Sequence, residues 1–189
     1  MTIIAIRGTF GAGKTHLVKR LMARYEGNET IRQGKQVVGH TLGDNLFVVG
    51  PYTSACGGAD RLFWTVKKAA IFMERLILHW HEHGYHVVFE SSTTSQWVKQ
   101  LGKLADEAPV EIIQLTTPFE QCLSAVKARR AERAAKTGRK ATPLDKTRKV
   151  ARDIYDRSLR GASELEEMGL PVHYLDREAA FHKLCDLTR

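Results

Sequence analysis

The sequence predicts an α/β fold, a doubly wound and mainly parallel sheet with helices on both faces, and three observations support it. Short apolar runs rich in β-branched residues alternate with longer amphipathic segments along the chain. Most of the short runs are apolar throughout, as strands buried on both faces of a parallel sheet are. The length of 189 residues suits one domain of this class. We therefore expect residues 1–189 to form a single domain.

Strands and helices are expected in alternation along the chain. The strands cover residues 2–7, 36–41, 46–50, 85–90, 110–115 and 172–175. The helices cover residues 13–25, 59–83, 95–106, 118–136, 143–168 and 177–187. The turn signal Gly43-Asp44-Asn45 predicts that residues 36–50 form a hairpin at the sheet edge. Loops are expected at residues 26–35 and 137–142, which are mostly polar.

The helix expected over residues 59–83 has the clearest pattern. Apolar residues recur there every three or four positions, which is the period of one buried helix face. They are Leu62, Val66, Ala69, Met73, Leu76 and Trp80. Charged residues fall between them, and the pattern ends at Gly84. A single long helix is therefore predicted.

The composition excludes several classes of protein. With 43% hydrophobic and 8% aromatic residues, the chain is far from the composition of disordered proteins. No run approaches the roughly 20 apolar residues of a membrane-spanning helix, and no signal peptide precedes the first strand. The three cysteines are widely spaced, so neither a disulfide framework nor a zinc site is expected. We expect a soluble protein of the reducing cytoplasm.

The formal net charge of +8 is concentrated in one segment. The whole chain has 29 Lys and Arg residues against 21 Asp and Glu residues. Residues 127–152 alone hold eleven basic and two acidic side chains, a net of +9, so the rest of the chain sums to about −1. A uniformly basic surface is excluded, and this segment has to account for the positive charge.

A phosphate-binding pattern stands between the first expected strand and the first expected helix. The residues that match G-x-x-x-x-G-K-[ST] are Gly8, Thr9, Phe10, Gly11, Ala12, Gly13, Lys14 and Thr15. The glycines let successive backbone N–H groups turn toward phosphate oxygens, at the positive end of the helix dipole. Lys14 is expected to reach the β- and γ-phosphates of ATP, and Thr15 to hold Mg²⁺. The alternative is a glycine-rich turn without a ligand.

An acid, Glu90, ends the strand expected at residues 85–90. In an open α/β sheet, ligands bind at the carboxyl ends of the strands. Glu90 is therefore a candidate to order a water on Mg²⁺, together with Thr15, or to act as general base on an acceptor hydroxyl. The alternative is a carboxylate that only caps the helix that follows.

The basic segment begins within the helix expected at residues 118–136. The apolar stripe of Phe119, Cys122 and Val126 continues in register into three arginines, which are Arg129, Arg130 and Arg133. This helix, a polar break and a second helix from residue 143 are typical of the lid of a P-loop phosphotransferase, here about residues 127–152. The arginines would close over the triphosphate and stabilise charge on the transferring phosphoryl group. The alternative is an exposed helix with solvated cations.

A segment rich in turn formers, residues 50–60, joins an expected strand to the long helix. Its Gly57-Gly58 pair allows the backbone to approach a ligand closely. Asp60 stands at the start of the helix, where it is a candidate to orient an acceptor hydroxyl. The alternative is that Asp60 only stabilises the helix terminus.

Four elements together resemble the phage-encoded 5-hydroxymethyluracil DNA kinases, within the nucleoside and nucleotide kinase branch of the P-loop NTPases. They are residues 8–15, the Tyr-x-x-x-Cys-Gly-Gly-x-Asp element of residues 52–60, the Phe89-Glu90 strand end, and Ala128-Arg129-Arg130 followed by Pro143-Leu144-Asp145. The resemblance implies a P-loop NTPase kinase fold, similar to that of the thymidylate kinases, with a helical basic lid. It also implies substrate contacts by Tyr52, Cys56, Gly57, Gly58 and Asp60.

The same resemblance implies an activity. ATP, with Mg²⁺, would phosphorylate the 5-hydroxymethyl group of a thymine analogue already inside DNA, an early step of thymidine hypermodification in a phage genome, in the host cytoplasm. The catalytic residues would be Lys14, Asp60, Glu90, Arg129, Arg130 and Arg133. A DNA partner agrees with the charge, because a kinase acting on a polymer has to hold backbone phosphates. The expectation of DNA binding depends on the basic residues of the segment other than the three lid arginines. They are chiefly Arg139, Lys140, Lys146, Arg148, Lys149 and Arg152.

Two other functions stay open at this point. A small-molecule kinase would phosphorylate a free deoxynucleotide or sugar, and a non-catalytic DNA-binding protein would use the nucleotide only as a switch. Two details of the mechanism also stay open. Either Asp60 or Glu90 could serve as the base, and the acceptor base could react within the duplex or extruded from it.

Overall fold

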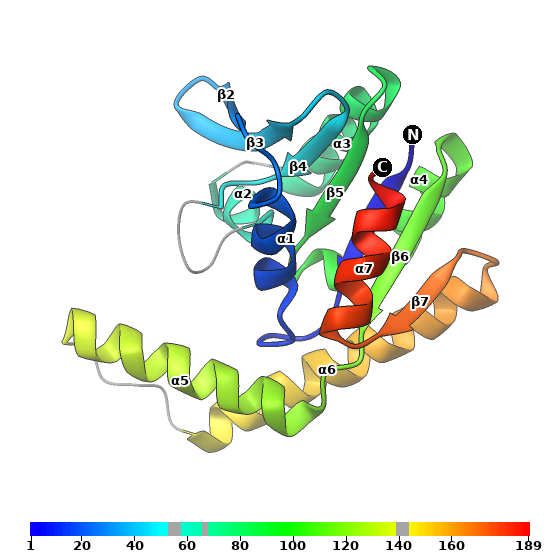
Figure 1. Ribbon diagram of the computed structural model, residues 1–189. Coiled ribbons are helices and arrows are strands. Elements are labelled where there is room, and N and C mark those ends of the chain that lie inside the picture. The colour runs from blue at the N-terminus through cyan, green and yellow to red at the C-terminus, as the bar shows by residue number, and fades with distance from the viewer. Residues whose placement is uncertain (53–57, 66–67, 139–143) are drawn as a thin grey trace.

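The computed structural model describes residues 1–52, 58–65, 68–138 and 144–189. A seven-stranded sheet forms its centre, and helices cover both faces of the sheet (Figure 1). The strands are β1 (Ile3–Arg7), β2 (Glu29–Gln33), β3 (Gln36–Leu42), β4 (Leu46–Val49), β5 (His86–Glu90), β6 (Val110–Leu115) and β7 (Val172–Leu175). The helices are α1 (Lys14–Met22), α2 (Asp60–Thr65), α3 (Ala69–Glu82), the short 3-10 helix η1 (Thr94–Gln96), α4 (Lys99–Glu107), α5 (Phe119–Thr137), α6 (Leu144–Glu167) and α7 (Arg177–Leu187).

The strand order is β2-β3-β4-β5-β1-β6-β7. The five adjacent strands β4, β5, β1, β6 and β7 are parallel to one another, and β3 is antiparallel to both β2 and β4. The predicted α/β fold with a doubly wound, mainly parallel sheet is therefore confirmed. Because β1 lies between β5 and β6, the carboxyl ends of these three strands meet at one edge of the sheet, at the first β-to-α connection.

The hydrophobic core lies on both faces of the sheet. Side chains of α3 and α4 pack on one face, and those of α1 and α7 on the other. β1 is buried along its whole length, which explains why its sequence is apolar without alternation. Burial of these faces is the main force that fixes the strand order, and with it the place where the connecting loops converge.

One strand was missed and the edge of the sheet was assigned wrongly. Residues 26–35 were expected to be a loop, but β2 pairs with β3 and occupies the edge. Only Ile31 of β2 is even partly buried, so the strand has almost no apolar pattern to reveal it. Its stability comes from backbone pairing with β3. The expected hairpin of residues 36–50 is confirmed, but β4 pairs with β5 inside the sheet.

The single long helix predicted over residues 59–83 is wrong. Two helices, α2 and α3, take its place, and Lys68 stands before α3 with a left-handed φ of 57°. The apolar register continues across the break, since Leu62, Ala69 and Met73 are all buried. The periodicity thus predicted which residues face the core. It carried no information on whether the backbone between them is continuous.

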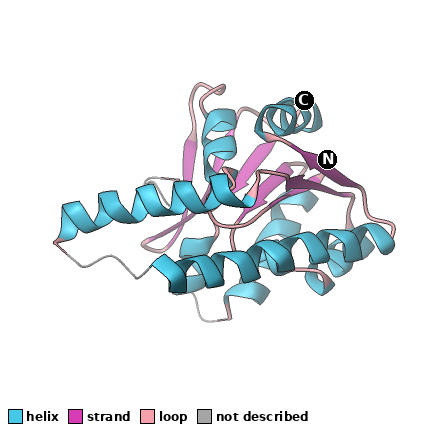
Figure 2. Cartoon of the chain, turned by 90° about the horizontal axis from the view of Figure 1, so that it is seen from below, coloured by secondary structure: helices cyan, strands magenta, loops and turns pink. Residues whose placement is uncertain are grey.

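The helices α5 and α6 extend together from the carboxyl edge of the sheet (Figures 1 and 2). The two helices contact through Phe119 and Tyr155, whose ring centroids are 5.5 Å apart in an edge-to-face arrangement. We call this pair of helices the arm. Among the described residues, the arm and the other helices include none that is both long and apolar enough to cross a membrane.

Candidate active site

The chain turns from β1 into α1 through residues 8–13, the predicted phosphate-binding loop. Gly13 is the N-cap residue of α1, and no side chain caps this helix start. Gly11 has a φ of 79°, and a Cβ atom there would lie 2.3 Å from the carbonyl oxygen of Cys122. Only glycine fits this close approach of two backbones. The loop therefore leaves the amino end of α1, with its partial positive charge, open to an anion.

Three side chains from other segments and one backbone carbonyl of α6 hold the loop in this shape. Thr117 donates its hydroxyl to the carbonyl oxygen of Ala12 at 2.9 Å, and Arg177 donates Nε to the same oxygen at 3.0 Å. The Gly8 N–H donates to Ser95 Oγ at 3.2 Å, and the Thr9 hydroxyl contacts the carbonyl oxygen of Ala151 in α6 at 3.4 Å. Because loop carbonyls are bonded to groups outside the loop, its curvature does not depend on a ligand.

Lys14 lies inside the loop and is only 6% exposed. Its ammonium group donates to the carbonyl oxygens of Gly8 at 2.8 Å and Thr9 at 3.0 Å. Burial lowers the pKa of Lys14, and the charges of Glu90 and Asp60 act in the opposite direction. The ammonium group is thus held by two backbone carbonyl oxygens and by the negative charges of Glu90 and Asp60. To reach a phosphate, it exchanges these two carbonyl partners for phosphate oxygens.

Glu90, the last residue of β5, lies beside Ile6 of β1 and is 1% exposed. Its Oε1 accepts a hydrogen bond of 2.9 Å from the Thr15 hydroxyl. Burial raises the pKa of Glu90 from 4.5 to about 7, against the opposing effects of Lys14 and of the Thr15 hydrogen bond. The structure therefore brings together Thr15 and Glu90, the two residues predicted to bind a metal. A hydroxyl and a carboxylate are oxygen ligands that fit Mg²⁺.

Gly58 packs directly against Glu90. A Cβ atom on Gly58 would lie 2.2 Å from Glu90 Oε1, and the residue has a left-handed φ of 78°. The next N–H, that of Ala59, donates to the carbonyl oxygen of Glu90 at 3.1 Å. The close approach at this glycine is therefore to the Glu90 carboxyl group, and the approach to a ligand that the sequence predicts stays a prediction. Cys56 and Gly57 lie outside the described residues.

Asp60 begins α2 and faces the segment that follows β5. Its carboxylate accepts hydrogen bonds from the Ser92 backbone N–H, at 3.0 and 3.1 Å, and from the Ser92 hydroxyl at 3.2 Å. These bonds fix the orientation of the carboxylate. Asp60 also acts on Glu90, because its negative charge contributes to the raised pKa there. The two acids thus form one electrostatically coupled pair beside Lys14.

Tyr52 lies between β4 and the start of α2 and is 7% exposed. Its phenol oxygen is buried, and among the described residues it has no hydrogen-bond partner. Burial, with the negative charges of Glu90 and Asp60, raises the pKa of Tyr52 well above its ordinary value of 10. The phenol is therefore neutral, and it lies within the electrostatic field of the acid pair.

The three candidate lid arginines of α5 differ in their surroundings. Arg129 is exposed and stands three residues after Val126, whose side chain packs close to Gly11 of the loop. Its positive charge lowers the pKa of both Glu90 and Lys14. Arg130 donates to the Thr147 hydroxyl and thereby joins α5 to α6. Arg133 is exposed, and its carbonyl oxygen accepts from the Thr137 hydroxyl.

Several contacts of the site were not predicted from the sequence. Ser92, Ser95, Thr117 and Arg177 all bond to the loop or to Asp60. Each of them follows the carboxyl end of a strand by a few residues, namely β5, β6 or β7. A polar residue just after a buried parallel strand is the signal that would have found them.

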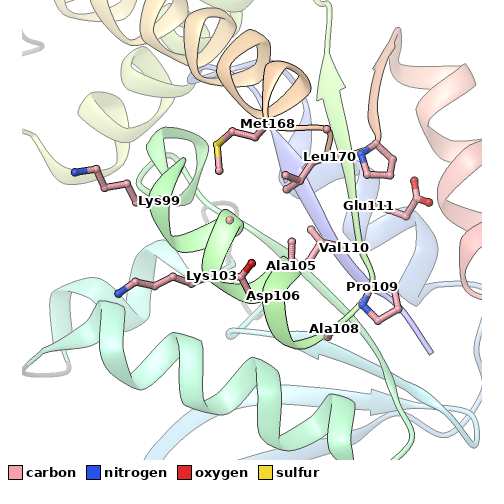
Figure 3. A pocket seen from close by; sticks show the side chains of 13 residues that line it. Lys99, Lys103, Ala105, Asp106, Ala108, Pro109, Val110, Glu111, Met168 and Leu170 are labelled. Carbon is pink, nitrogen blue, oxygen red and sulfur yellow. The ribbon is translucent and has the colours of Figure 1, made fainter.

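A large cavity elsewhere does not belong to this site. It measures about 740 Å³ and lies between α4 and the segment that joins α6 to β7 (Figure 3). Pro109 and Val110 line it where β6 begins, and Lys99, Lys103 and Met168 border it. The cavity is therefore at the amino end of the strands, opposite the phosphate-binding loop.

A glycine-rich loop of this form between a buried strand and a helix, with an acid at the neighbouring strand end and a basic helical arm, is the arrangement of a P-loop phosphotransferase. No family model matches the chain. The chain is, however, 31% identical over 193 residues to the 5-hmdU DNA kinase of Pseudomonas phage PaMx11, covering 98% of this chain and 96% of that protein. The chain belongs to the family of this 5-hmdU DNA kinase. Among solved structures, deoxyadenosine kinase from M. mycoides with bound dATP aligns over 98% of both chains, with a TM-score of 0.41 and 15% identity.

Proposed function

We propose that this kinase transfers the γ-phosphate of ATP to the 5-hydroxymethyl group of 5-hydroxymethyl-deoxyuridine within DNA, in thymidine hypermodification of a phage genome. The observation that carries this proposal is the relationship to a 5-hmdU DNA kinase over nearly the whole of both chains. The reaction forms a bond between the acceptor oxygen and the γ-phosphorus and breaks the bond between that phosphorus and the oxygen bridging it to the β-phosphate. ADP leaves, and the acceptor hydroxyl loses its proton.

In this proposal, residues 8–15 bind the triphosphate. The open amino end of α1 and the Lys14 ammonium supply positive charge to the β- and γ-phosphates. Thr15 and Glu90 would hold Mg²⁺, which neutralises charge on the phosphates when bound. The support for this pair is its geometry, a hydroxyl and a buried carboxyl group 2.9 Å apart beside the loop.

We assign the orientation of the acceptor hydroxyl to Asp60. Glu90 is bonded to Thr15 on the side of the phosphate-binding loop, whereas Asp60 is held by Ser92 at the start of α2. A carboxylate has room for further donors beyond these bonds, since each oxygen carries two lone pairs. Asp60 would then accept the hydrogen bond, and finally the proton, of the hydroxyl that attacks the phosphorus.

The outer part of the arm, residues 127–152, would serve as the lid. It would belong to the single kinase domain that the whole chain forms. Arg129 is the arginine that would act on the γ-phosphate, since its charge already reaches Glu90 and Lys14. Arg130 would couple the two helices of the arm through Thr147, and Arg133 would contact phosphates from the exposed side. In phosphoryl transfer, positive charge placed beside the transferring phosphoryl group stabilises the transition state, and this electrostatic effect is usually the largest contribution to catalysis.

DNA would bind along the same arm. The charge available to DNA is smaller than +9, because Arg148 pairs with Glu120 and Arg152 pairs with Asp156. Lys149 is exposed on α6, whereas Arg139 and Lys140 lie outside the described residues. Contacts between such cations and phosphates would position the strand, and the pocket beside Asp60 would select the base.

Transfer of labelled γ-phosphate tests this function. The acceptors are DNA containing hydroxymethyluracil, unmodified DNA and free hydroxymethyl-deoxyuridine monophosphate. We expect label only on the first. Label on the free monophosphate would indicate a small-molecule kinase, and ATP-dependent retention of DNA without label would indicate a non-catalytic DNA-binding protein. Lys14→Ala is the inactive variant, and Lys103→Ala at the far end of the sheet is its matched control.

A further inference from the structure

Two buried polar atoms of neighbouring side chains have no hydrogen-bond partner among the described residues. They are the phenol oxygen of Tyr52 and Nε2 of His40. Each residue is 7% exposed, so water does not replace the missing partner. Burying a polar atom without a partner costs free energy, and folded proteins rarely keep such atoms without a use for them. Two of them in neighbouring side chains point to a common ligand.

The two side chains belong to one small cluster. The ring centroids of His40 and Tyr52 are 6.4 Å apart, with the planes tilted by 57°. His40 stands on β3 opposite Val48 of β4, and Tyr52 follows the end of β4 by a few residues. The other ring nitrogen of His40, Nδ1, lies 3.3 Å from the hydroxyl oxygen of Thr30 on β2. The imidazole is therefore fixed through Nδ1, and Nε2 is left for another partner.

The backbone places Tyr52 close to Glu90. The carbonyl oxygen of Pro51, the residue before Tyr52, accepts from the Gly58 N–H at 3.2 Å, and Gly58 packs against Glu90 Oε1. The charges of both Glu90 and Asp60 act on the Tyr52 phenol. Burial lowers the pKa of His40, so the imidazole is neutral, with one nitrogen a donor and the other an acceptor. The pair can thus offer one donor and one acceptor side by side, without any charge.

We propose that Tyr52 and His40 bind the Watson–Crick edge of the acceptor pyrimidine. This inference rests on the proposed function, since a 5-hydroxymethyl group at Asp60 places the adjacent C4 carbonyl of the base toward the Tyr52 phenol. The phenol donates to that carbonyl oxygen. Nε2 of His40 accepts from the N3–H group, and Nδ1–H donates to Thr30. The Tyr52 phenol, Nε2 of His40, and the C4 oxygen and N3–H of the base are then all paired.

One consequence concerns the state of the DNA. In a duplex, the Watson–Crick edge of the base is already paired, although its C5 substituent is open to the major groove. A kinase that reads this edge acts on a base that has left the stack or on single-stranded DNA. The enzyme therefore phosphorylates hydroxymethyluracil opposite an abasic site about tenfold faster than the same base opposite adenine, because no base pair has to be broken.

A paired change of protein and base tests the contact directly. Two single-stranded oligonucleotides are compared, one with 5-hydroxymethyluracil and one with 5-hydroxymethyl-4-thiouracil, which keeps the N3–H donor and replaces the C4 oxygen by sulfur, a weak hydrogen-bond acceptor. The wild-type enzyme prefers the first by about 10- to 100-fold in kcat/KM, the usual value of a buried hydrogen bond. Tyr52→Phe removes this preference, so that the ratio of the two kcat/KM values falls to about 1. Tyr25→Phe, a partly buried tyrosine of another surface, keeps it.

Further readouts separate recognition from a structural role. Because the Tyr52 hydroxyl has no partner in the described residues, Tyr52→Phe keeps or raises the Tm. His40→Leu raises the KM for the acceptor and leaves the KM for ATP unchanged. The inference is overturned if the wild-type and Tyr52→Phe enzymes show the same ratio of kcat/KM for the two oligonucleotides. It is also overturned if Tyr52→Phe lowers the Tm and leaves that ratio unchanged.

The same oligonucleotides distinguish this inference from the proposed function. Their affinities are also measured by fluorescence anisotropy, which does not depend on phosphate transfer. If no phosphate is transferred but Tyr52→Phe removes the difference in affinity, the proposed function fails and the recognition stands. If phosphate is transferred, and Tyr52→Phe leaves the differences in affinity and in kcat/KM between the two oligonucleotides unchanged, the proposed function stands and the proposed recognition fails.

Discussion

The phosphate-binding site and the arm use charge in opposite ways. In the site, Lys14, Glu90 and Asp60 are buried or half-buried, and each has short contacts to named groups. In the arm, the ion pairs of Arg148 with Glu120 and of Arg152 with Asp156 lie on side chains about half exposed to solvent. Water screens the second kind of pair and not the first. Substitutions should therefore have large effects in the site and small ones at these exposed ion pairs of the arm.

The largest effect is expected for Lys14→Ala. Removal of the ammonium takes away positive charge from the β- and γ-phosphates in the transition state, which should lower kcat by about a thousandfold. Phosphate transfer is measured under saturating ATP. Lys103→Ala, which removes a lysine bordering the cavity at the other end of the sheet, should keep wild-type activity. Full turnover by Lys14→Ala would contradict the proposed role of the loop.

Glu90→Gln should change the pH dependence of stability. Burial raises the pKa of Glu90 from 4.5, its value in an unfolded chain, to about 7 in the folded protein. Between pH 4.5 and pH 7, folding is therefore coupled to the uptake of a proton by Glu90. The associated stability is fully present below pH 4.5 and is lost as pH rises through 7. Above pH 8 the glutamine variant should be more stable than wild type, by up to about 3 kcal/mol.

Chemical denaturation of the nucleotide-free protein in chelator, at pH 5 and pH 8, measures this difference. The gap between the variant and wild type should be larger at pH 8. Thr15→Val, which removes only the hydrogen-bond donor of Glu90, serves as the comparison. A gap of the same size at both pH values would show that Glu90 does not titrate in this range.

Asp60→Asn should reduce kcat by about 10- to 100-fold, because the amide still accepts from Ser92 but takes the acceptor proton poorly. The KM for ATP should stay unchanged. Ser92→Ala, which removes one donor to Asp60 and leaves the backbone donor, should have a smaller effect. Equal losses in Asp60→Asn and Asp60→Ala, with a raised KM for ATP, would place Asp60 on the nucleotide rather than on the acceptor.

Gly58→Ala tests how tightly Glu90 is packed. Its Cβ atom would lie 2.2 Å from Glu90 Oε1, so the carboxyl group has to move, at a cost of about 1–3 kcal/mol. Gly27→Ala is the matched control, because Gly27 has a similar φ of 75° with no atom within 4 Å of a Cβ. Unfolding free energies of the two variants are compared. Equal losses would mean that only the backbone conformation matters.

The smallest effect is expected in the arm. Arg148→Ala removes an exposed ion pair with Glu120 and should lower stability by less than about 1 kcal/mol. A double-mutant cycle with Glu120→Ala measures the pair itself, at low and at high salt. A coupling energy above about 2 kcal/mol that persists at high salt would remove the contrast between arm and site.

The features predicted well from the sequence are those encoded locally. The phosphate-binding loop follows from residues 8–15 with a buried strand before and a helix after them. The acid at the end of β5 follows from its position after an apolar run. The parallel strands are recognisable because burial on both faces leaves few polar residues in them.

The features that were missed depend on contacts outside their own segment, in most cases with residues distant in the sequence. β2 is stabilised by pairing with β3, and nothing in its own residues indicates burial. The left-handed backbone at Lys68 leaves the apolar period intact, so the pattern could not show it. Arg177 reaches the loop across 165 residues of chain, and His40 meets Tyr52 only because β3 and β4 are neighbours. Such contacts follow from strand order, which local patterns do not fix.

The most direct test of the whole account is the nucleoside composition of treated DNA. DNA containing hydroxymethyluracil is incubated with the enzyme, ATP and Mg²⁺, digested to nucleosides by enzymes that leave monoester phosphate on the base, and analysed by mass. The account predicts 5-phosphomethyl-deoxyuridine with wild-type enzyme and none with Lys14→Ala. Unchanged hydroxymethyl-deoxyuridine in the DNA, together with phosphorylation of the free nucleotide, would contradict it.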